Sequence, residues 1–330
     1  MDREAILRAL RQGAGEYVSG EQLSAALGMT RAAVWKEIRA LRDEGYEIES
    51  KTRCGYRLVA MPDRLCAEGV RALITPRTVG REVLCFDTLD STNNYAKQAA
   101  QNGAENGLVV IANQQTGGRG RCGRTFLSPP DRGLYLTALL RPDIAPADAL
   151  PITALAAVAA CRAVEKVCPL QSGIKWTNDL VLGNRKLAGI LTEMGVEGES
   201  GALQYIVIGI GINVNQTAED FPPELAEVGT SLHIALGKPV SRTALAAALI
   251  GELDGMYDRL GGDLTAELAE YRRRCVTLGR RVRILGSGME RTAEALDVDE
   301  AFGLIVRRED GTLETVRSGE VSVRGLYGYV

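Results

Sequence analysis

The sequence predicts an α+β protein of three parts: an amino-terminal winged helix-turn-helix, a central α/β domain on a mixed sheet, and a small carboxy-terminal β-barrel. Three observations predict this order. Helical spacing of apolar residues fills the first sixty residues, apolar strands then alternate with helical stretches, and short strands follow Cys275 at close intervals. We expect domains at 1–60, 81–273 and 274–330, with a linker at 61–80 that starts near Met61-Pro62.

The composition is that of an ordinary soluble chain, with 330 residues, 25% of them charged, and a net charge of −3. Any nucleic-acid contact must therefore come from one small face. The seven cysteines are scattered and there is one histidine, so neither a zinc site nor a disulfide framework is expected. No signal peptide is evident, and no uninterrupted apolar run reaches the roughly 18 residues that span a bilayer. We expect a cytoplasmic protein with no membrane partner.

The first part has the pattern of a helix-turn-helix. Residues 4–10 have helical spacing. Ser19 can cap a short helix that ends near Leu27, and Gly28 supplies the turn. Thr30 can then cap a second helix.

The second of these helices has one apolar and one polar face. Val34, Ile38 and Leu41 would face the core, and two alternating runs at 45–50 and 55–59 predict a hairpin that forms a wing. A helical interaction module with no DNA role is the alternative, because acidic residues nearly balance basic ones here. The face that could enter a major groove consists of Thr30, Arg31, Ala32, Trp35, Lys36 and Arg39.

In the central part, Ser91, Thr92 and Asn93 lie between a predicted strand at 83–86 and a predicted helix at 95–101. Short polar side chains at this position commonly cap a helix, which is the favoured interpretation of the cluster taken alone. Two hydroxyls and an amide can equally satisfy the donors and acceptors of a urea or amide group. The cluster therefore predicts either a cap or a site for a neutral polar ligand.

Residues 115–124 contain four glycines and three arginines directly after the apolar run 108–111, so a buried strand leads into a glycine loop. Glycine lets backbone amides approach a ligand, and arginine offers a planar set of donors to phosphate or carboxylate. The loop matches neither a P-loop nor a dinucleotide fingerprint. It predicts an anion site, with a flexible basic surface loop as the alternative.

Residues 174–182 and 185–193 predict a hairpin around Gly183-Asn184. Asp179 and Lys186 lie on its two arms, where a carboxylate for Mg²⁺ and an ammonium for a phosphoryl group could converge. A surface ion pair is the alternative.

Further elements complete the expected order. Gly209 and Gly211 permit close approach of a backbone or ligand to a buried strand at 205–214. An alanine-rich helix is expected at 147–167, with Pro151 in its first turns, and Asp310-Gly311 indicates a late hairpin. The remaining expected elements are a strand at 134–140, helices at 245–260 and 264–274, and strands at 281–285, 291–297, 303–308, 313–316 and 318–323.

Five motifs together resemble the biotin protein ligase family, in its bifunctional form that is also the biotin-operon repressor. They are S-T-N at 91–93, Q-T-G-G-R-G-R-C-G-R at 115–124, K-W-T-N-D-L at 175–180, R-K-L-A-G-I-L-T-E at 185–193 and G-I-G-I-N-V-N at 209–215. The resemblance implies a class II synthetase-like central domain and an SH3-like carboxy-terminal barrel. Thr177 stands where proline is usual, and Cys122 where a basic residue is frequent.

The resemblance also implies a reaction in two steps. Biotin and MgATP give biotinyl-5'-AMP and pyrophosphate, and a lysine of a biotin carboxyl carrier protein then takes the biotin. Operator DNA and a second copy of the chain are the other implied partners. The alternatives are a DNA-binding biotin or adenylate sensor without ligase activity, and a lipoate or octanoate transferase on the related fold.

The roles of individual residues follow from the same resemblance. Catalysis would fall to Lys186, Arg119, Arg121 and Asp179, with Asp179 also the candidate ligand of Mg²⁺. Biotin would contact Ser91, Thr92, Asn93, Gln115, Arg119, Gly120, Arg121, Lys186, Gly189, Gly209 and Gly211. ATP or AMP would contact Arg119, Arg121, Arg124, Lys175, Trp176, Asn178 and Asn213.

Overall fold

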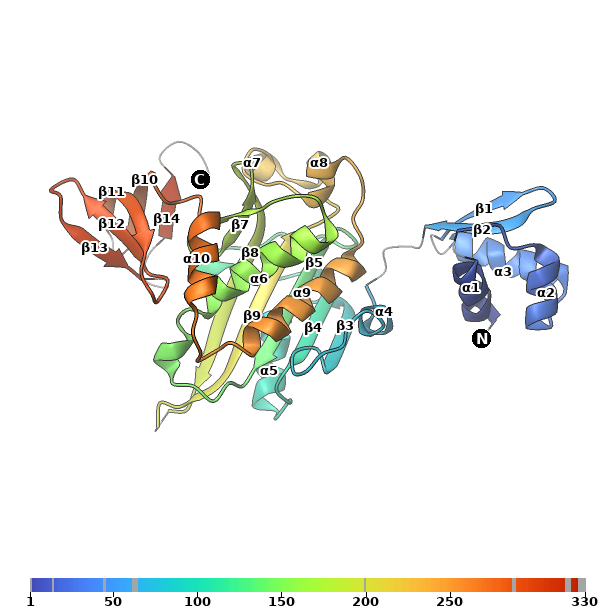
Figure 1. Cartoon of the computed structure of the whole chain (residues 1–330), viewed down its shortest axis with the longest axis horizontal. Coiled ribbons are helices and arrows are strands. Elements are labelled where there is room, and N and C mark those ends of the chain that lie inside the picture. Colours follow the sequence, from blue (N-terminus) through green and yellow to red (C-terminus); the bar gives the residue numbers. More distant parts are fainter. Residues whose placement is uncertain are drawn as a thin grey trace. The chain divides into compact units, whose positions relative to one another are not determined.

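A computed structural model describes residues 2–13, 15–43, 46–60, 65–198, 200–286, 289–317 and 322–325. The chain divides into two compact units, Met1–Arg64 and Leu65–Val330. Figure 1 shows the elements of both units, each of which is described by itself.

The first unit packs three helices against a two-stranded antiparallel hairpin. Ser19 caps α2 as predicted: its hydroxyl accepts from the Gln22 amide at 3.1 Å, while the Gln22 side chain accepts from the Ser19 amide. Gly28 ends α2 in the left-handed conformation, with φ of 63°. The unit has its own core, to which Val34, Ile38 and Leu41 contribute. Its elements are α1 (Asp2–Gln12), α2 (Gly20–Leu27), α3 (Arg31–Asp43), β1 (Glu47–Lys51) and β2 (Gly55–Ala60).

A seven-stranded mixed sheet forms the centre of the second unit, in the order β3-β4-β5-β9-β8-β7-β6. Only the β3 and β4 pair is parallel among the described strands. Gly183, with φ of 58°, lies in the tight turn between β7 and β8, as the hairpin prediction required. The strands are β3 (Glu82–Leu89), β4 (Leu108–Gln115), β5 (Gly133–Leu140), β6 (Gly173–Lys175), β7 (Asp179–Leu182), β8 (Arg185–Val196) and β9 (Leu203–Asn213).

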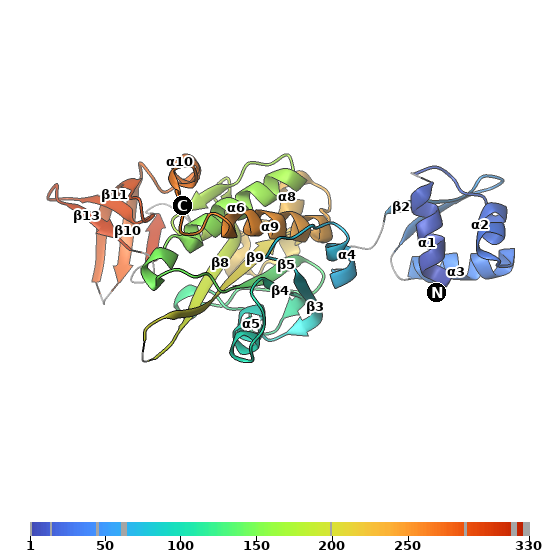
Figure 2. The ribbon, with the colours of Figure 1, turned by 60° about the horizontal axis from the view of Figure 1, so that its bottom comes forward.

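Helices cover both faces of this sheet. In Figure 2, α6 (Ile152–Val167) and α9 (Arg242–Tyr257) lie above the strands and α5 (Thr92–Gln101) lies below them. The main core fills the α6 and α9 side, and a smaller cluster fills the α5 side. The shorter helices are α4 (Ala67–Arg71), α7 (Pro223–Ala226) and α8 (Leu232–Leu236).

One expectation about α6 needs correction. The helix expected at 147–167 starts only at Ile152, because Pro151 is its N-cap and a separate 3₁₀ turn, η2 (Pro146–Ala149), precedes it. The stretch Pro146–Val167 is also long and apolar enough to cross a membrane by length and composition, although 72% of its most apolar window is buried, as in a core helix.

Residues 65–80, expected to be linker, belong to the folded part of the second unit. Leu65, Val70 and Val79 are buried in its main core. Asp254 of α9 accepts hydrogen bonds from the backbone amides of residues 77–79, at 2.8 to 2.9 Å. Apolar side chains and these amides therefore fix this segment on α9.

The carboxy-terminal part is a five-stranded antiparallel sheet in the order β13-β12-β11-β10-β14. Its buried side chains, among them Phe302, join the main core of the second unit. The Asp310-Gly311 hairpin joins β12 to β13 as predicted. Closure of the sheet into a barrel stays a prediction. Residues 318–321 of the last predicted strand lie outside the described residues. The elements are α10 (Thr265–Arg274), β10 (Arg281–Gly286), β11 (Met289–Val298), β12 (Leu304–Arg308), β13 (Leu313–Val316) and β14 (Ser322–Gly325).

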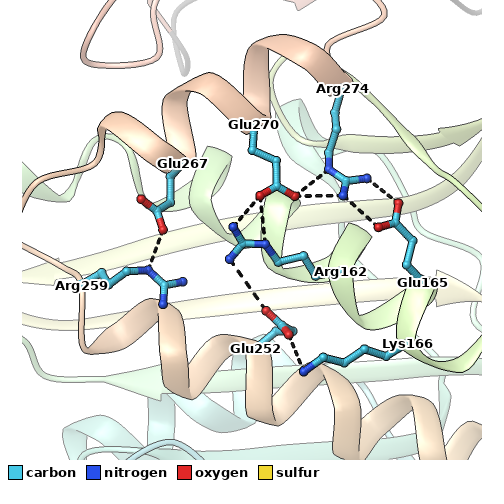
Figure 3. Close-up of polar contacts among 8 residues, drawn as sticks. All are labelled: Arg162, Glu165, Lys166, Glu252, Arg259, Glu267, Glu270 and Arg274. Atoms are coloured by element: carbon cyan, nitrogen blue, oxygen red, sulfur yellow. Dashed lines mark hydrogen bonds and ion pairs between the residues drawn. The ribbon is translucent and has the colours of Figure 1, made fainter.

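A group of ion pairs joins α10 to α6 and to the end of α9, as Figure 3 shows. Glu270 of α10 pairs with Arg162 of α6, and Arg274 reaches Glu165 on the same helix. Burial opposes ionisation of Glu270, but hydrogen bonds from Arg162 and Arg274 hold the pKa of its carboxyl below the usual value. The remaining contacts are Lys166 to Glu252 and Arg259 to Glu267, each at 2.6 Å, Arg274 to Glu270 at 2.9 Å, and Arg162 to Glu252 at 4.0 Å.

Candidate active site

The Ser91-Thr92-Asn93 cluster lies at the start of α5, on the face of the sheet that α5 covers. Ser91 occupies the N-cap position, but its side chain makes no capping hydrogen bond. All three residues are buried, with at most 4% of each exposed. The capping interpretation is therefore wrong for this cluster, whose side chains point into the domain and not back to the helix end.

Thr92 and Asn93 belong to a buried hydrogen-bond network. The backbone amide and hydroxyl of Thr92 donate to Gln115 Oε1 at 2.9 and 3.1 Å. The Thr137 hydroxyl lies 2.8 Å from that of Thr92 and 2.7 Å from Asn93 Oδ1. Gln115 Nε2 in turn donates to the Ser128 hydroxyl. These contacts fix the orientation of two side-chain amides before any ligand binds.

Glu193 on β8 connects this network to the glycine-arginine loop. Its carboxylate accepts from Asn93 Nδ2 at 2.9 Å and pairs with Lys97 at 2.7 Å and Arg119 at 3.2 Å. Burial raises the pKa of Glu193, but hydrogen bonds from Lys97 and Asn93, with the charges of Lys97 and Arg119, hold it below the usual value. The carboxylate is ionised at neutral pH.

Backbone hydrogen bonds and close packing shape the loop itself. The Gly117 amide donates to the Asp90 carbonyl, and the Phe126 amide to the Gly118 carbonyl. A Cβ at Gly118 would lie 2.3 Å from the Phe126 carbonyl oxygen, so only glycine fits there. Cys122 adopts a φ of 54° in the exposed tip of the loop. The loop is thus tied to β3 and folded back on itself.

The predicted convergence across the β7-β8 hairpin is confirmed. Lys186 Nζ lies 2.7 Å from Asp179 Oδ1, and both side chains are largely buried. A Cβ at Gly189 would lie 3.2 Å from Lys186 Nζ. Asn178 accepts a hydrogen bond from Arg121 at 2.9 Å, which brings the loop to the same hairpin. The pair is therefore part of a polar site and not an exposed surface contact.

Two cavities meet at these residues. The inner cavity lies over the Ser91-Thr92-Asn93 cluster, and the outer cavity lies between the loop, the hairpin and β10. Arg121, Asn178 and Lys186 line both. The two cavities thus share a wall that carries an arginine and a lysine, where two anionic groups would meet.

The structure brings all the residues predicted to contact biotin to the inner cavity: Ser91, Thr92, Asn93, Gln115, Arg119, Gly120, Arg121, Lys186, Gly189, Gly209 and Gly211. Gly209 and Gly211 make room there for protein side chains, because a Cβ would lie 1.9 Å from Asn93 Oδ1 and 2.5 Å from the Phe126 ring, respectively. The close approach that these two glycines permit is therefore an approach of the Asn93 and Phe126 side chains to the strand.

The outer cavity receives most of the residues predicted to contact the nucleotide. Arg119 is the exception, because it lines the inner cavity and is hydrogen-bonded to Asn94 and Glu193. The others are Arg121, Arg124, Lys175, Trp176, Asn178 and Asn213.

Sequence reasoning missed several residues of the inner site. Thr137 is fully buried, and the sequence feature that could have indicated it is a threonine inside the apolar strand 133–140. Phe126 and Tyr135 line the cavity with rings in edge contact at 6.4 Å. Glu193 ends a motif that was recognised, but nothing in its spacing indicates its three partners.

Within the described residues, no group of three or more His, Cys, Asp or Glu side chains is arranged to hold a metal ion. Asp179 is the carboxylate of the outer cavity. It could serve as one ligand of an ion that is held mainly by phosphate oxygens, the usual arrangement for Mg²⁺.

In the first unit, the predicted outer face of α3 is exposed over Thr30, Arg31, Ala32, Trp35, Lys36 and Arg39. Thr30 accepts a hydrogen bond from the Ala33 amide, and 55% of Trp35 is exposed. The Arg39 guanidinium lies 5.8 Å from the Trp35 ring centre, and Arg31 pairs with Glu21. The face therefore presents cations and an aromatic ring on a capped helix.

Comparison with known families defines the class of protein. Residues 85–213 match the Biotin/lipoate A/B protein ligase family, residues 2–57 match an HTH domain, and residues 277–324 match the Biotin protein ligase C terminal domain. The chain belongs to the biotin protein ligase family, in the branch of bifunctional ligases and repressors.

The relatives share nearly the whole length of the chain. It is 34% identical to the bifunctional ligase/repressor BirA of Bacillus subtilis (strain 168), over 97% of this chain and 98% of the relative. Identity to the bifunctional ligase/repressor BirA of Escherichia coli (strain K12) is 31%, over 94% of each. Among solved structures, biotin protein ligase from Aquifex aeolicus in complex with biotin and ATP is 25% identical, with a TM-score of 0.64 over 74% of this chain and 99% of that one.

Proposed function

We propose that this chain is an ATP-dependent biotin protein ligase that forms biotinyl-5'-AMP and transfers biotin to a lysine of a biotin carboxyl carrier protein, and that it also represses biotin genes. Membership of the family and the similarity to BirA proteins support both activities. The observation that carries the ligase proposal is the wall of Arg121 and Lys186 between two cavities.

Biotin would occupy the inner cavity, with its ureido ring over the Ser91-Thr92-Asn93 cluster. Both N–H groups of the Asn93 amide are already used, one by the Leu191 carbonyl and one by Glu193. Asn93 can therefore only accept from a ligand, through Oδ1, which suits a ureido N–H. Ser91 and Thr92 offer hydroxyl groups to the same end of the cavity.

The biotin carboxylate and the α-phosphate of ATP would meet at the shared wall. A carboxylate oxygen attacks the α-phosphorus, the bond from that phosphorus to the bridging oxygen breaks, and pyrophosphate leaves. Arg121 and Lys186 hold two repelling anions together and stabilise the charge that develops, which can supply most of the acceleration. The loop would then cover the adenylate and exclude water.

In the second step, the carrier lysine attacks the acyl carbon of the anhydride and AMP leaves with the phosphate oxygen. The attacking amine must be neutral, so a nearby carboxylate is needed to take its proton. Asp179 is the carboxylate at this place. Mg²⁺ would enter with ATP and neutralise the phosphate oxygens, with Asp179 as the candidate protein ligand.

Arg119 has a different role in this proposal. Its guanidinium donates to Glu193 and Asn94, so it ties the loop to the biotin pocket and does not reach the nucleotide side. Charge at the reaction centre would come from Arg121 and Lys186.

The test is a search by mass spectrometry for biotinyl-5'-AMP bound to the protein after incubation with biotin and ATP. We expect the adenylate with the wild-type protein and free biotin alone with Lys186→Ala. Wild-type protein that binds biotin but forms no adenylate would instead support a sensor without ligase activity. Exclusive reaction with octanoate or lipoate would support the transferase alternative.

For repression, the exposed face of α3 would enter the major groove, and a homodimer would bind two half-sites. A gel shift with a biotin-synthesis promoter, with and without biotin and ATP, tests this function. We expect a shift that strengthens when adenylate forms. No shift in either condition would leave an enzyme whose first unit does not regulate.

Several finer features belong to the same proposal. The carboxy-terminal sheet would close into an SH3-like barrel, and the central domain would be of the class II synthetase-like type. The functional domains would be 1–60, a catalytic domain that includes the folded residues 65–80 and ends near 273, and 274–330, in a cytoplasmic protein.

A further inference from the structure

Residues 175–179 join β6 to β7 and contribute several walls of the outer cavity. Asn178 accepts from Arg121, and Asp179 pairs with Lys186. The direction of this short segment therefore sets where both cations of the shared wall are held. Asn178 is hydrogen-bonded to Ile190 of the central sheet, whereas Trp176 and Thr177 receive hydrogen bonds from residues outside that sheet.

Trp176 is the first contact between this segment and the carboxy-terminal part. Its backbone amide donates to the Thr277 hydroxyl at 2.9 Å, and its indole N–H donates to the Phe302 carbonyl at 2.9 Å. Trp176 is 4% exposed and Thr277 is 3% exposed. Both hydrogen bonds are thus closed to water, where a lost partner is costly.

Tyr271 of α10 supplies a further contact, at the next residue of the segment. Its hydroxyl, on a fully buried side chain, donates to the Thr177 carbonyl at 3.3 Å. Its ring meets that of Phe302 edge to face, with centres 5.3 Å apart. Burial raises the pKa of Tyr271 well above its usual value, so the hydroxyl stays protonated and can donate.

The helix that carries Tyr271 is itself fixed. Glu270 and Arg274, on either side of it, pair with Arg162 and Glu165 of α6, as Figure 3 shows. The chain directly after α10 extends the same connection to β6 through an isolated bridge, in which the Val276 amide donates to the Ile174 carbonyl. A connected path thus runs from α6 through α10 to the backbone of Trp176 and Thr177.

We propose that Tyr271, Thr277 and Phe302 form a clamp on Trp176-Thr177 that positions the nucleotide half of the active site. Thr277 and Tyr271 are positioning residues and do not touch the reacting atoms. The proposal rests on the proposed ligase function. It gives the carboxy-terminal part a task in adenylation through hydrogen bonds to the backbone of the segment, in addition to Arg283, which lines the outer cavity.

The full-length variants Thr277→Val and Tyr271→Phe each remove one hydroxyl with little change of shape. We expect kcat/KM for ATP in pyrophosphate release to fall about tenfold or more, the usual effect of orphaning a buried hydrogen-bonding group. Biotin affinity without ATP, measured by calorimetry, should stay within about twofold, because the Thr92, Asn93 and Thr137 network at the other end of the inner cavity does not contact Trp176 or Thr177. Thr277→Ser should restore ATP use, since it keeps the hydroxyl.

Thr315→Val, at an exposed position on β13 of the same sheet, serves as the matched control and should leave both substrates unaffected. Unchanged ATP kinetics in Thr277→Val and Tyr271→Phe would overturn the clamp, as would an equal loss of biotin affinity, which would indicate a general loss of structure. Binding of α,β-methylene ATP, by calorimetry, gives a second measurement. If the wild-type protein binds this analogue but releases no pyrophosphate from ATP, the proposed function fails. The clamp is then still tested by the affinity of the variants for the analogue.

Discussion

The replacement Gly209→Ala tests how closely the sheet approaches the Ser91-Thr92-Asn93 cluster. The added Cβ would lie 1.9 Å from Asn93 Oδ1 and 2.8 Å from its Cγ, about 1.5 Å short of ordinary contact. Asn93 cannot yield freely, because Thr137, the Leu191 carbonyl and Glu193 all hold its amide. The methyl group must therefore displace the carboxamide and break part of this network.

Two costs add up in this variant. Overpacking of a rigid site costs about 1–3 kcal/mol, and each buried hydrogen bond lost costs about 1 kcal/mol more. We expect the free energy of unfolding to fall by about 2–4 kcal/mol. Biotin affinity should fall about tenfold or more, because the displaced amide enters the inner cavity and its acceptor no longer points at the ligand.

The matched control is Gly251→Ala, an exposed position in α9 where an added Cβ meets no atom within 4 Å. Alanine there should raise stability by about 0.5–1 kcal/mol and leave biotin affinity unchanged. Urea unfolding and calorimetric titration with biotin measure the two effects. If Gly209→Ala bound biotin like the wild-type protein at equal stability, the assignment of the inner cavity to the Asn93 network would be wrong.

Three further predictions use other parts of the molecule. Lys186→Ala should slow pyrophosphate release about a hundredfold or more while biotin still binds, because a preorganised charge at the shared wall is lost; release at the wild-type rate would refute its role. Because the pKa of Glu193 is lowered in the folded protein, its charged form stabilises the fold above the unfolded pKa of about 4.3, and this stabilisation disappears as pH falls through the lower folded value. The difference in melting temperature between wild type and Glu193→Gln should therefore be largest near pH 7 and shrink below pH ~4, and a constant difference would contradict this. Lys36→Glu combined with Arg39→Glu should abolish the gel shift and leave ligase kinetics intact, and retained DNA binding would exclude the α3 face.

Local signals were sufficient for much of the fold. Ser19 and Gly28 mark the ends of α2 because capping depends on residues close in sequence. The Asp179 and Lys186 contact followed from a tight turn, which fixes the register of two neighbouring strands. These features depend only on residues that are close in the sequence.

The interior of the site could not be predicted in this way. Ser91 has the sequence context of a cap, but neighbours from other strands decide where this segment points. Asn93 meets Glu193, one hundred positions away in the sequence, and Thr137 meets Asn93, forty-four positions away. Gly209 permits close approach as expected, but its partner was visible only in three dimensions. Pairings between distant strands depend on topology, which a local pattern does not encode.

The charged junction of α6, α9 and α10 has a consequence for how this protein can change over time. Its basic members, Arg162, Lys166, Arg259 and Arg274, are balanced by Glu165, Glu252, Glu267 and Glu270. Loss of a basic member would leave an unpaired charge on Glu252, Glu267 or Glu270, whose side chains are at most 12% exposed. Substitutions in descendants of this sequence should therefore occur as reciprocal swaps or joint replacements, and a lone neutral residue among the eight should be rare.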